Sequence, residues 1–209
     1  MPVDVDNGFA KLEALLGRRA DYIREPQPGN APAVAVGRFP SVKVGLFRRF
    51  RVPVADRFVY ITSGMSSVPM QIPAEEAAIY PPQVELIAYC RGAYVGAHDG
   101  QDMVSGYLQA LAHMPFNTEI FFGPMHTAAV EERICPDSEM RAFFFALPDG
   151  IEMGRLCACT PAAQLVLSVM PITPSEREFA VDRGPDRLVE LFAKRNVPNY
   201  FDPFRKSAV

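Results

Sequence analysis

Four cysteines and three histidines are the side chains of this sequence best suited to bind a metal or to act as nucleophiles. Cys135, Cys157, Cys159 and His126 together supply enough soft ligands for a zinc ion. Their spacing argues against such a site, because zinc ligands usually come in two pairs about two to four residues apart. If Leu156–Thr160 is a strand, the sulfurs of Cys157 and Cys159 lie about 7 Å apart on one face. We expect no metal site, and whether these four residues converge in the fold stays open.

A serine follows a predicted strand at Gly64-Met65-Ser66-Ser67. A nucleophile elbow needs Gly-x-Ser-x-Gly with a helix directly after it, whereas a proline-rich segment follows here. We interpret this serine as a turn residue that hydrogen-bonds the local backbone.

The sequence has no glycine-rich phosphate loop either. These observations predict a protein that is not an enzyme, with no catalytic residues and no cofactor. The alternative is a metal- or thiol-dependent hydrolase that uses Cys and His residues.

Charge is almost balanced along the chain, with 21 basic and 24 acidic residues and a net charge of −3. A nucleic-acid binder usually has a basic excess or a clustered basic face. Arg48, Arg49 and Arg51 are the one short basic cluster. They lie on a predicted strand, where alternate residues face opposite ways and cannot form one dense patch. Nucleic acid is therefore not an expected partner.

The longest apolar runs, Ala142–Leu147 and Leu165–Met170, are strand-sized and too short to span a bilayer. The first residues are acidic and no apolar stretch of signal length follows them. Four cysteines in 209 residues are too sparse for a disulfide framework. We expect a reduced, cytoplasmic protein that does not enter a membrane.

Proline, glycine and hydrophobic periodicity divide the chain into short elements. The predicted elements are a helix around Phe9–Leu16, a surface connector at residues 25–32, strands at Ala33–Val36, Val42–Val52 and Arg57–Thr62, a proline-rich loop at Val68–Pro82, a strand at Val84–Arg91, a helix at Gln101–Met114, strands at Glu119–Phe122, Arg141–Leu147, Leu156–Thr160 and Gln164–Met170, two helices after Thr173, and a tail over 196–209.

Strands cluster in the middle of the chain, and helices lie at both ends with one inserted between them. This order is typical of an α+β domain rather than of regular strand–helix alternation. We predict a mixed, mainly antiparallel sheet covered by helices. Neither composition nor a repeat marks a boundary, so residues 1–209 are expected to form a single domain.

From residue 57 to residue 194, the order of segments resembles the suppressor-of-fused family. The resemblance is carried by the strand Phe58–Thr62 with the turn Gly64-Met65-Ser66, by Val84-Glu85-Leu86-Ile87, by the helix Tyr107–Ala112, by Phe121-Phe122-Gly123, and by Leu167–Thr173 followed by Glu176, Gly184 and Leu188–Phe192. The resemblance implies a suppressor-of-fused-like fold and a domain that binds another protein without catalysis.

Short bacterial relatives of this family imply a narrower expectation, an immunity-type protein whose partner is a toxin. A strand added to an exposed sheet edge, or contact with the Val68–Pro82 loop, is the expected mode of binding. No partner-binding residue can be carried over from the family. An exposed sheet edge and an aromatic tail also allow a homodimer.

Overall fold

The computed structural model describes residues 5–44, 51–91, 102–148, 153–160 and 162–209. Its elements, in chain order, are α1 (Val5–Leu16), β1 (Tyr22–Arg24), β2 (Ala35–Val44), β3 (Arg51–Ser63), the 3₁₀ turn η1 (Met65–Ser67), β4 (Val84–Arg91), α2 (Met103–Asn117), β5 (Thr127–Ala129), β6 (Ala142–Ala146), α3 (Met153–Cys159), β7 (Leu165–Ile172), α4 (Pro174–Arg183) and α5 (Pro185–Lys194).

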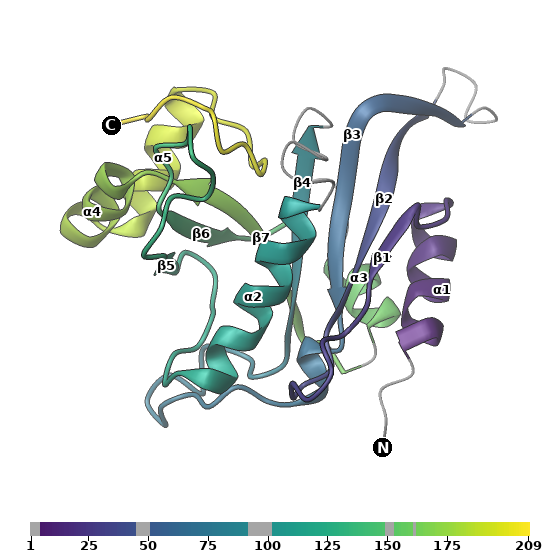
Figure 1. Cartoon of the computed structure of the whole chain (residues 1–209). Coiled ribbons are helices and arrows are strands. Elements are labelled where there is room, and N and C mark those ends of the chain that lie inside the picture. Colours follow the sequence, from purple (N-terminus) through teal and green to yellow (C-terminus); the bar gives the residue numbers. More distant parts are fainter. Residues whose placement is uncertain (1–4, 45–50, 92–101, 149–152, 161) are drawn as a thin grey trace.

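The strands of the described residues form one sheet in the order β1-β2-β3-β4-β7-β6-β5 (Figure 1). Every neighbouring pair is antiparallel except β4 and β7, which run parallel and place Val84 beside Leu165. The predicted mixed, mainly antiparallel sheet is therefore confirmed. None of the described helices is both long and apolar enough to cross a membrane.

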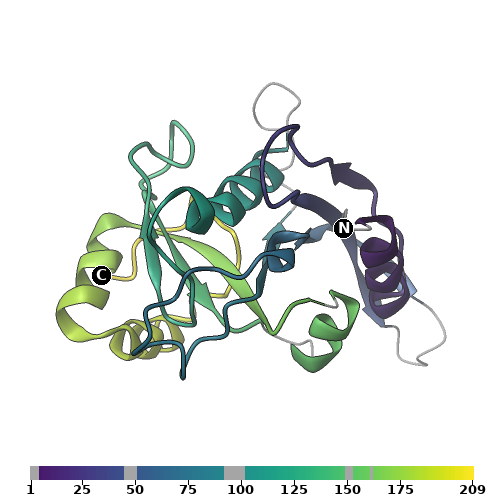
Figure 2. The same ribbon diagram turned by 90° about the horizontal axis from the view of Figure 1, so that it is seen from below.

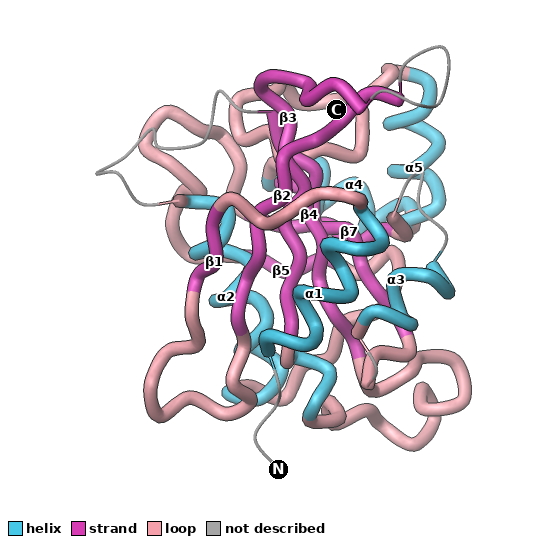
Figure 3. The backbone as a smooth tube through the Cα atoms, turned by 90° about the vertical axis from the view of Figure 1, so that its right-hand side faces the viewer, coloured by secondary structure: helices cyan, strands magenta, loops and turns pink. Residues whose placement is uncertain are grey.

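Helices cover both faces of the sheet, and the alternation of side chains along each strand supplies both cores. On β4, Leu86 and Ala88 belong to the core under α2, whereas Ile87 belongs to the core under α1 and α3. Figure 3 shows α2 on one side of the strands and α1 and α3 on the other. At the far end of the sheet, α4 and α5 lie over one face (Figure 2). There they pack on Phe144 and Met170.

Several predicted elements are confirmed. The strand Val84–Arg91 has the predicted bounds, and the predicted loop after Val68 contains no strand. Thr173 caps α4 in a capping box with Glu176, and Gly184 separates α4 from α5. These signals are local. A capping side chain bonds backbone amides within a few residues, and a glycine lets the backbone adopt the conformation that ends a helix.

Three predicted strands are wrong. Leu156–Thr160 lies mostly in helix α3, and Glu119–Phe122 forms no strand. Val42–Val52 is not one strand but the two arms of a hairpin, since Val44 at the end of β2 pairs with Arg51 at the start of β3. Short apolar runs do not distinguish helix from strand, and no glycine–asparagine signal marks that hairpin.

A buried carboxylate joins the end of β3 to the start of β4. Glu85 is 1% exposed, and it accepts hydrogen bonds from the hydroxyl of Thr62 (2.5 Å), the amide of Gly64 (2.9 Å), and both the amide (3.1 Å) and hydroxyl (2.7 Å) of Ser66. Burial raises the pKa of Glu85, and these hydrogen bonds oppose that shift.

The C-terminal segment 197–209 packs back onto the domain. Phe201 is fully buried between the rings of Tyr107 and Phe143, and its amide donates to the carbonyl of Tyr89 (2.6 Å). Further along, Arg205 donates to both carboxylate oxygens of Glu176 at 2.6 and 2.7 Å. The tail therefore joins the sheet to the start of α4.

We predict that Gly64→Ala destabilises the fold by about 3 kcal/mol or more. Gly64 has φ of 110°, and an added Cβ would lie 2.2 Å from the carbonyl oxygen of Ala33. Gly29→Ala is the matched control, because Gly29 also has positive φ (85°) but open space around its Cβ position. That control should lose only about 1 kcal/mol. Equal losses in urea denaturation would show that backbone strain alone accounts for Gly64.

Candidate protein-binding surface

The four residues weighed as zinc ligands are distributed over separate parts of the fold. Cys157 and Cys159 lie on α3, Cys135 lies between β5 and β6, and His126 directly precedes β5. Within the described residues, no group of three or more His, Cys, Asp or Glu side chains is close enough to hold a metal ion. Because α3 is helical, residues two positions apart point in different directions, so the same-face geometry assumed for Cys157 and Cys159 is wrong.

All four cysteines are free thiols. Burial raises the pKa of every one of them, that of Cys90 to about 12. A thiol with a raised pKa is neutral near pH 7 and is a weak nucleophile. The thiol-dependent alternative therefore has no activated cysteine in its support.

Ser66 does not have the environment of a nucleophile. Its hydroxyl donates to the buried carboxylate of Glu85, and the hydroxyl of Ser67 donates to the carbonyl of Gly64 (2.6 Å). The turn predicted from the sequence is present, but the local backbone bond expected of its first serine is wrong: Ser66 bonds a carboxylate 19 positions along the chain, and Ser67 makes the backbone bond. The hydroxyl groups of both serines therefore stabilise the turn.

The open edge of β5 is the first feature of the sheet suited to binding a protein. On one side β5 pairs with β6, so that Thr127 lies opposite Phe144 and Ala129 opposite Ala142. On its other side, no described strand pairs with β5. Along this edge runs a groove of about 460 Å³, here called the edge groove. It is lined by Met114, Glu119, Ile120, Phe121, Phe122, Thr127, Ala128, Ala129 and Arg177.

The backbone of β5 presents its free hydrogen-bonding groups to the open edge. His126 accepts a hydrogen bond from Phe145 (3.0 Å), and Val130 donates to Arg141 (2.9 Å), so the even-numbered residues bond toward β6. In an antiparallel pair the intervening residues direct their N–H and C=O groups away from the partner strand. Thr127 and Ala129 therefore offer these groups to the edge groove.

An aromatic cluster connects the proline-rich loop to the same region. The ring of Tyr80 lies 5.4 Å from that of Phe121 and 4.9 Å from that of His126, measured between centroids. Gly123 permits this packing, because a Cβ there would lie 2.4 Å from the Tyr80 ring. The two binding features predicted from sequence, a sheet edge and the Val68–Pro82 loop, thus meet in space.

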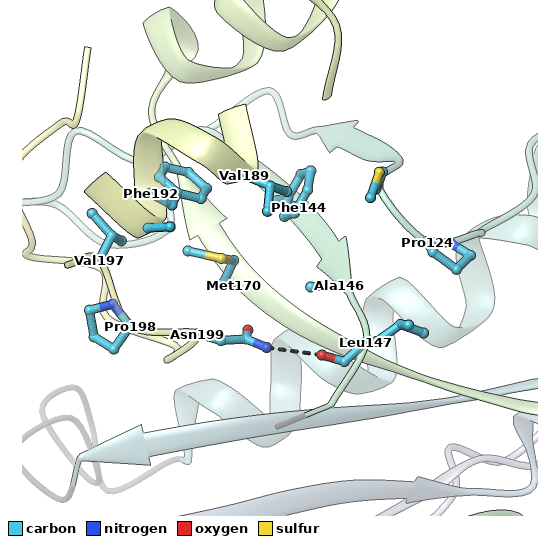
Figure 4. A pocket seen from close by; sticks show the side chains of 12 residues that line it. Pro124, Phe144, Ala146, Leu147, Met170, Val189, Phe192, Val197, Pro198 and Asn199 are labelled. Carbon is cyan, nitrogen blue, oxygen red and sulfur yellow. Dashed lines mark hydrogen bonds between the residues drawn. The ribbon is translucent and has the colours of Figure 1, made fainter. Parts of the chain in front are cut away.

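A second groove, of about 470 Å³, lies between α5 and strands β6 and β7, and it is here called the apolar groove (Figure 4). Its lining contains no charged side chain; it consists of Pro124, Met125, Phe144, Ala146, Leu147, Met170, Val189, Phe192, Ala193, Val197, Pro198 and Asn199. The amide of Asn199 donates to the carbonyl of Leu147 (3.3 Å) at one end of it.

Three of the exposed large hydrophobic residues of the described chain gather at the apolar groove. Met125, Leu147 and Val189 are 38%, 55% and 39% exposed. Met125 also has a φ of 68°, a backbone conformation that is unfavourable for a residue with a side chain. Exposed apolar side chains around a groove are typical of a surface that contacts another molecule.

Sequence reasoning missed both grooves. Residues of segment 119–129 line each of them. A turn and a three-residue strand such as β5 are too short to show a hydrophobic period in the sequence. Arg177 directly follows the capping box of α4, and its position in the sequence does not distinguish it from an ordinary exposed helix residue. The basic cluster at Arg48 and Arg49 lies outside the described residues.

These observations define an α+β domain with two adjoining grooves at the β5 end of its sheet. A family model for the suppressor of fused protein (SUFU) matches residues 49–206. The chain therefore belongs to the suppressor-of-fused family, and the resemblance found in the sequence is confirmed. A search of the curated proteins found no match.

Solved structures share the fold at low sequence identity. A SUFU homologue from Neisseria gonorrhoeae is 15% identical, with a TM-score of 0.61, over 98% of this chain and 96% of that one. A Sufu–Fu complex is 12% identical, with a TM-score of 0.64, over 99% and 93%. Drosophila Suppressor of Fused is 12% identical, with a TM-score of 0.57; 99% of this chain matches, spanning 51% of that protein.

We predict that Cys157 reacts with iodoacetamide before the other thiols in the native protein. It is the only cysteine that is half-buried rather than buried, whereas Cys90 is 3% exposed. Peptide mass spectrometry after timed labelling near neutral pH measures the order, with urea-unfolded protein as the control in which all four react. Rapid native labelling of Cys90 would contradict the assignment of inert, buried thiols.

Proposed function

We propose that this chain is a non-enzymatic protein-binding domain that accepts an extended segment of its partner along the open edge of β5. The observation that carries the proposal is the edge groove, into which Thr127 and Ala129 direct their backbone donors and acceptors. Addition of a strand to such an edge is a common mode of peptide recognition. Membership in a family with a solved Sufu–Fu complex supports a protein partner.

The apolar groove gives the same surface a second contact. Phe121 and Phe122 line the edge groove and Pro124 and Met125 line the apolar groove, so one short segment separates them. A three-residue edge offers few hydrogen bonds, each contributing only about 1 kcal/mol net. We infer that a large apolar side chain of the partner fills the apolar groove and supplies further affinity.

Three observations support a non-catalytic role. The described residues bring no metal-ligand cluster together, the thiols have raised pKa values, and Ser66 is held by a structural carboxylate. Free cysteines also support the narrower proposal that the protein works in the reducing cytoplasm.

We predict that Ala129→Pro abolishes partner binding while leaving stability within about 0.5 kcal/mol. Proline removes the N–H of Ala129, which faces the groove rather than β6, and edge strands tolerate proline. Ala128→Pro is the matched control: it removes a hydrogen bond of the β5–β6 ladder and should cost about 3 kcal/mol.

The measurement uses a photo-crosslinking amino acid at Thr127 in cells that express the chain, followed by sequencing of the crosslinked peptide. A crosslinked segment from another protein, lost in Ala129→Pro, is the expected result. A crosslink to β5 of a second copy would replace this proposal by a homodimer, which sedimentation would confirm. Undiminished crosslinking to the same segment in Ala129→Pro contradicts strand addition.

A finer form of the proposal is that the partner is a toxin, which the domain neutralises as an immunity protein. Its support is the match over nearly the whole length of a SUFU homologue from a bacterium. In cells arrested by a toxin domain encoded beside the gene, co-expression of the wild-type chain should restore growth. Co-expression of the Ala129→Pro variant should not. If the wild-type chain fails to relieve the growth arrest, the proposal of a toxin partner is rejected and the protein-binding proposal stands.

A further inference from the structure

We propose that Arg177 reads a carboxylate on the segment bound at β5, so that the partner sequence alternates apolar and acidic residues. This inference rests on the proposed strand addition and adds the chemistry of the partner to it. Arg177 projects from α4 into the lining of the edge groove, beside all three residues of β5. It is the only basic residue of that lining.

The guanidinium of Arg177 lacks a counter-ion within the described part of the chain. No ion pair or side-chain hydrogen bond joins it to another described residue, and its Nε is buried without a partner. The preceding residue shows the contrast, since Glu176 is paired through two oxygens with Arg205. A planar guanidinium matches a carboxylate in the same two-bond geometry, so Arg177 is suited to an acidic group brought by a ligand.

The two walls of the edge groove determine which side chains of an added strand meet Arg177. Met114 and Phe122 belong to the core region under α2, whereas α4 packs on the opposite face of the sheet. Side chains of an added strand alternate between these faces. Apolar residues of the partner therefore face Met114 and Phe122, and the residue between them faces Arg177.

Glu119 lines the same groove and is exposed, but it makes no ion pair with Arg177 in the structure. It is the single acidic residue of that lining and would compete with a carboxylate on the ligand. Removing its charge should therefore strengthen the binding of an acidic segment. This dependence separates carboxylate recognition from simple apolar contact.

The test uses two synthetic peptides with blocked ends and the full chain labelled with ¹⁵N. One peptide is valine–threonine–valine–aspartate–valine–threonine–valine, and the other has asparagine in place of aspartate. Titration is followed by the amide signals of Thr127 and Ala129 and by the Nε–H signal of Arg177. We expect the aspartate peptide to bind about tenfold more tightly at low salt, because charged hydrogen bonds are the stronger ones.

Arg177→Gln should bring the two affinities together, and Glu119→Gln should widen the difference between them. Arg183→Gln is the matched control on α4, since Arg183 lies outside the lining of the edge groove and should leave the preference unchanged. If both peptides shift the β5 signals equally in wild type and Arg177→Gln, carboxylate recognition fails and strand addition stands. If neither peptide shifts these signals, strand addition itself fails, and this inference fails with it.

Discussion

Glu85 places a carboxylate in the interior, where hydrogen bonds from Thr62, Gly64 and Ser66 replace those of water. A buried carboxylate is tolerated only when its oxygens are satisfied in this way. The bonds fix the end of β3 against the start of β4, and they set the direction in which the loop after Ser67 leaves the sheet. That loop carries Tyr80 to the aromatic cluster beside β5, so the position of the candidate surface depends on this interaction.

Glu176, at the start of α4, is a second fully buried carboxylate whose oxygens are satisfied by hydrogen bonds. It accepts hydrogen bonds from the amides of Thr173 and Ala208 and from the guanidinium of Arg205. The first turn of α4 is thereby held against the tail, and Arg177 is directed to the edge groove from a rigid helix. A structural carboxylate and a candidate recognition residue thus occupy consecutive positions with opposite roles, which their sequence alone does not distinguish.

The sequence predicts the parts of the fold that depend on local chemistry. The capping box at Thr173, the break at Gly184 and the strand at Val84 follow from residue types and spacing within one element. The helical α3 and the three-residue β5 were missed because tertiary packing decides such short segments. For the candidate surface, the sequence predicted only the type of site, an exposed sheet edge or a loop. Its residues could not be named, because the lining combines segments as distant in the sequence as Met114 and Arg177.

The packing of segment 197–209 onto the domain affects when the fold can be completed during translation. The elements from α1 to α5 can pack together as they emerge, but the ring of Phe201 and the counter-charge of Glu176 on Arg205 come only from residues synthesised later. Until Arg205 leaves the exit tunnel, a nascent domain retains an uncompensated carboxylate and an uncovered aromatic site. Completion of the fold is thereby tied to translation of segment 197–209, which supplies both the buried ring and the paired guanidinium.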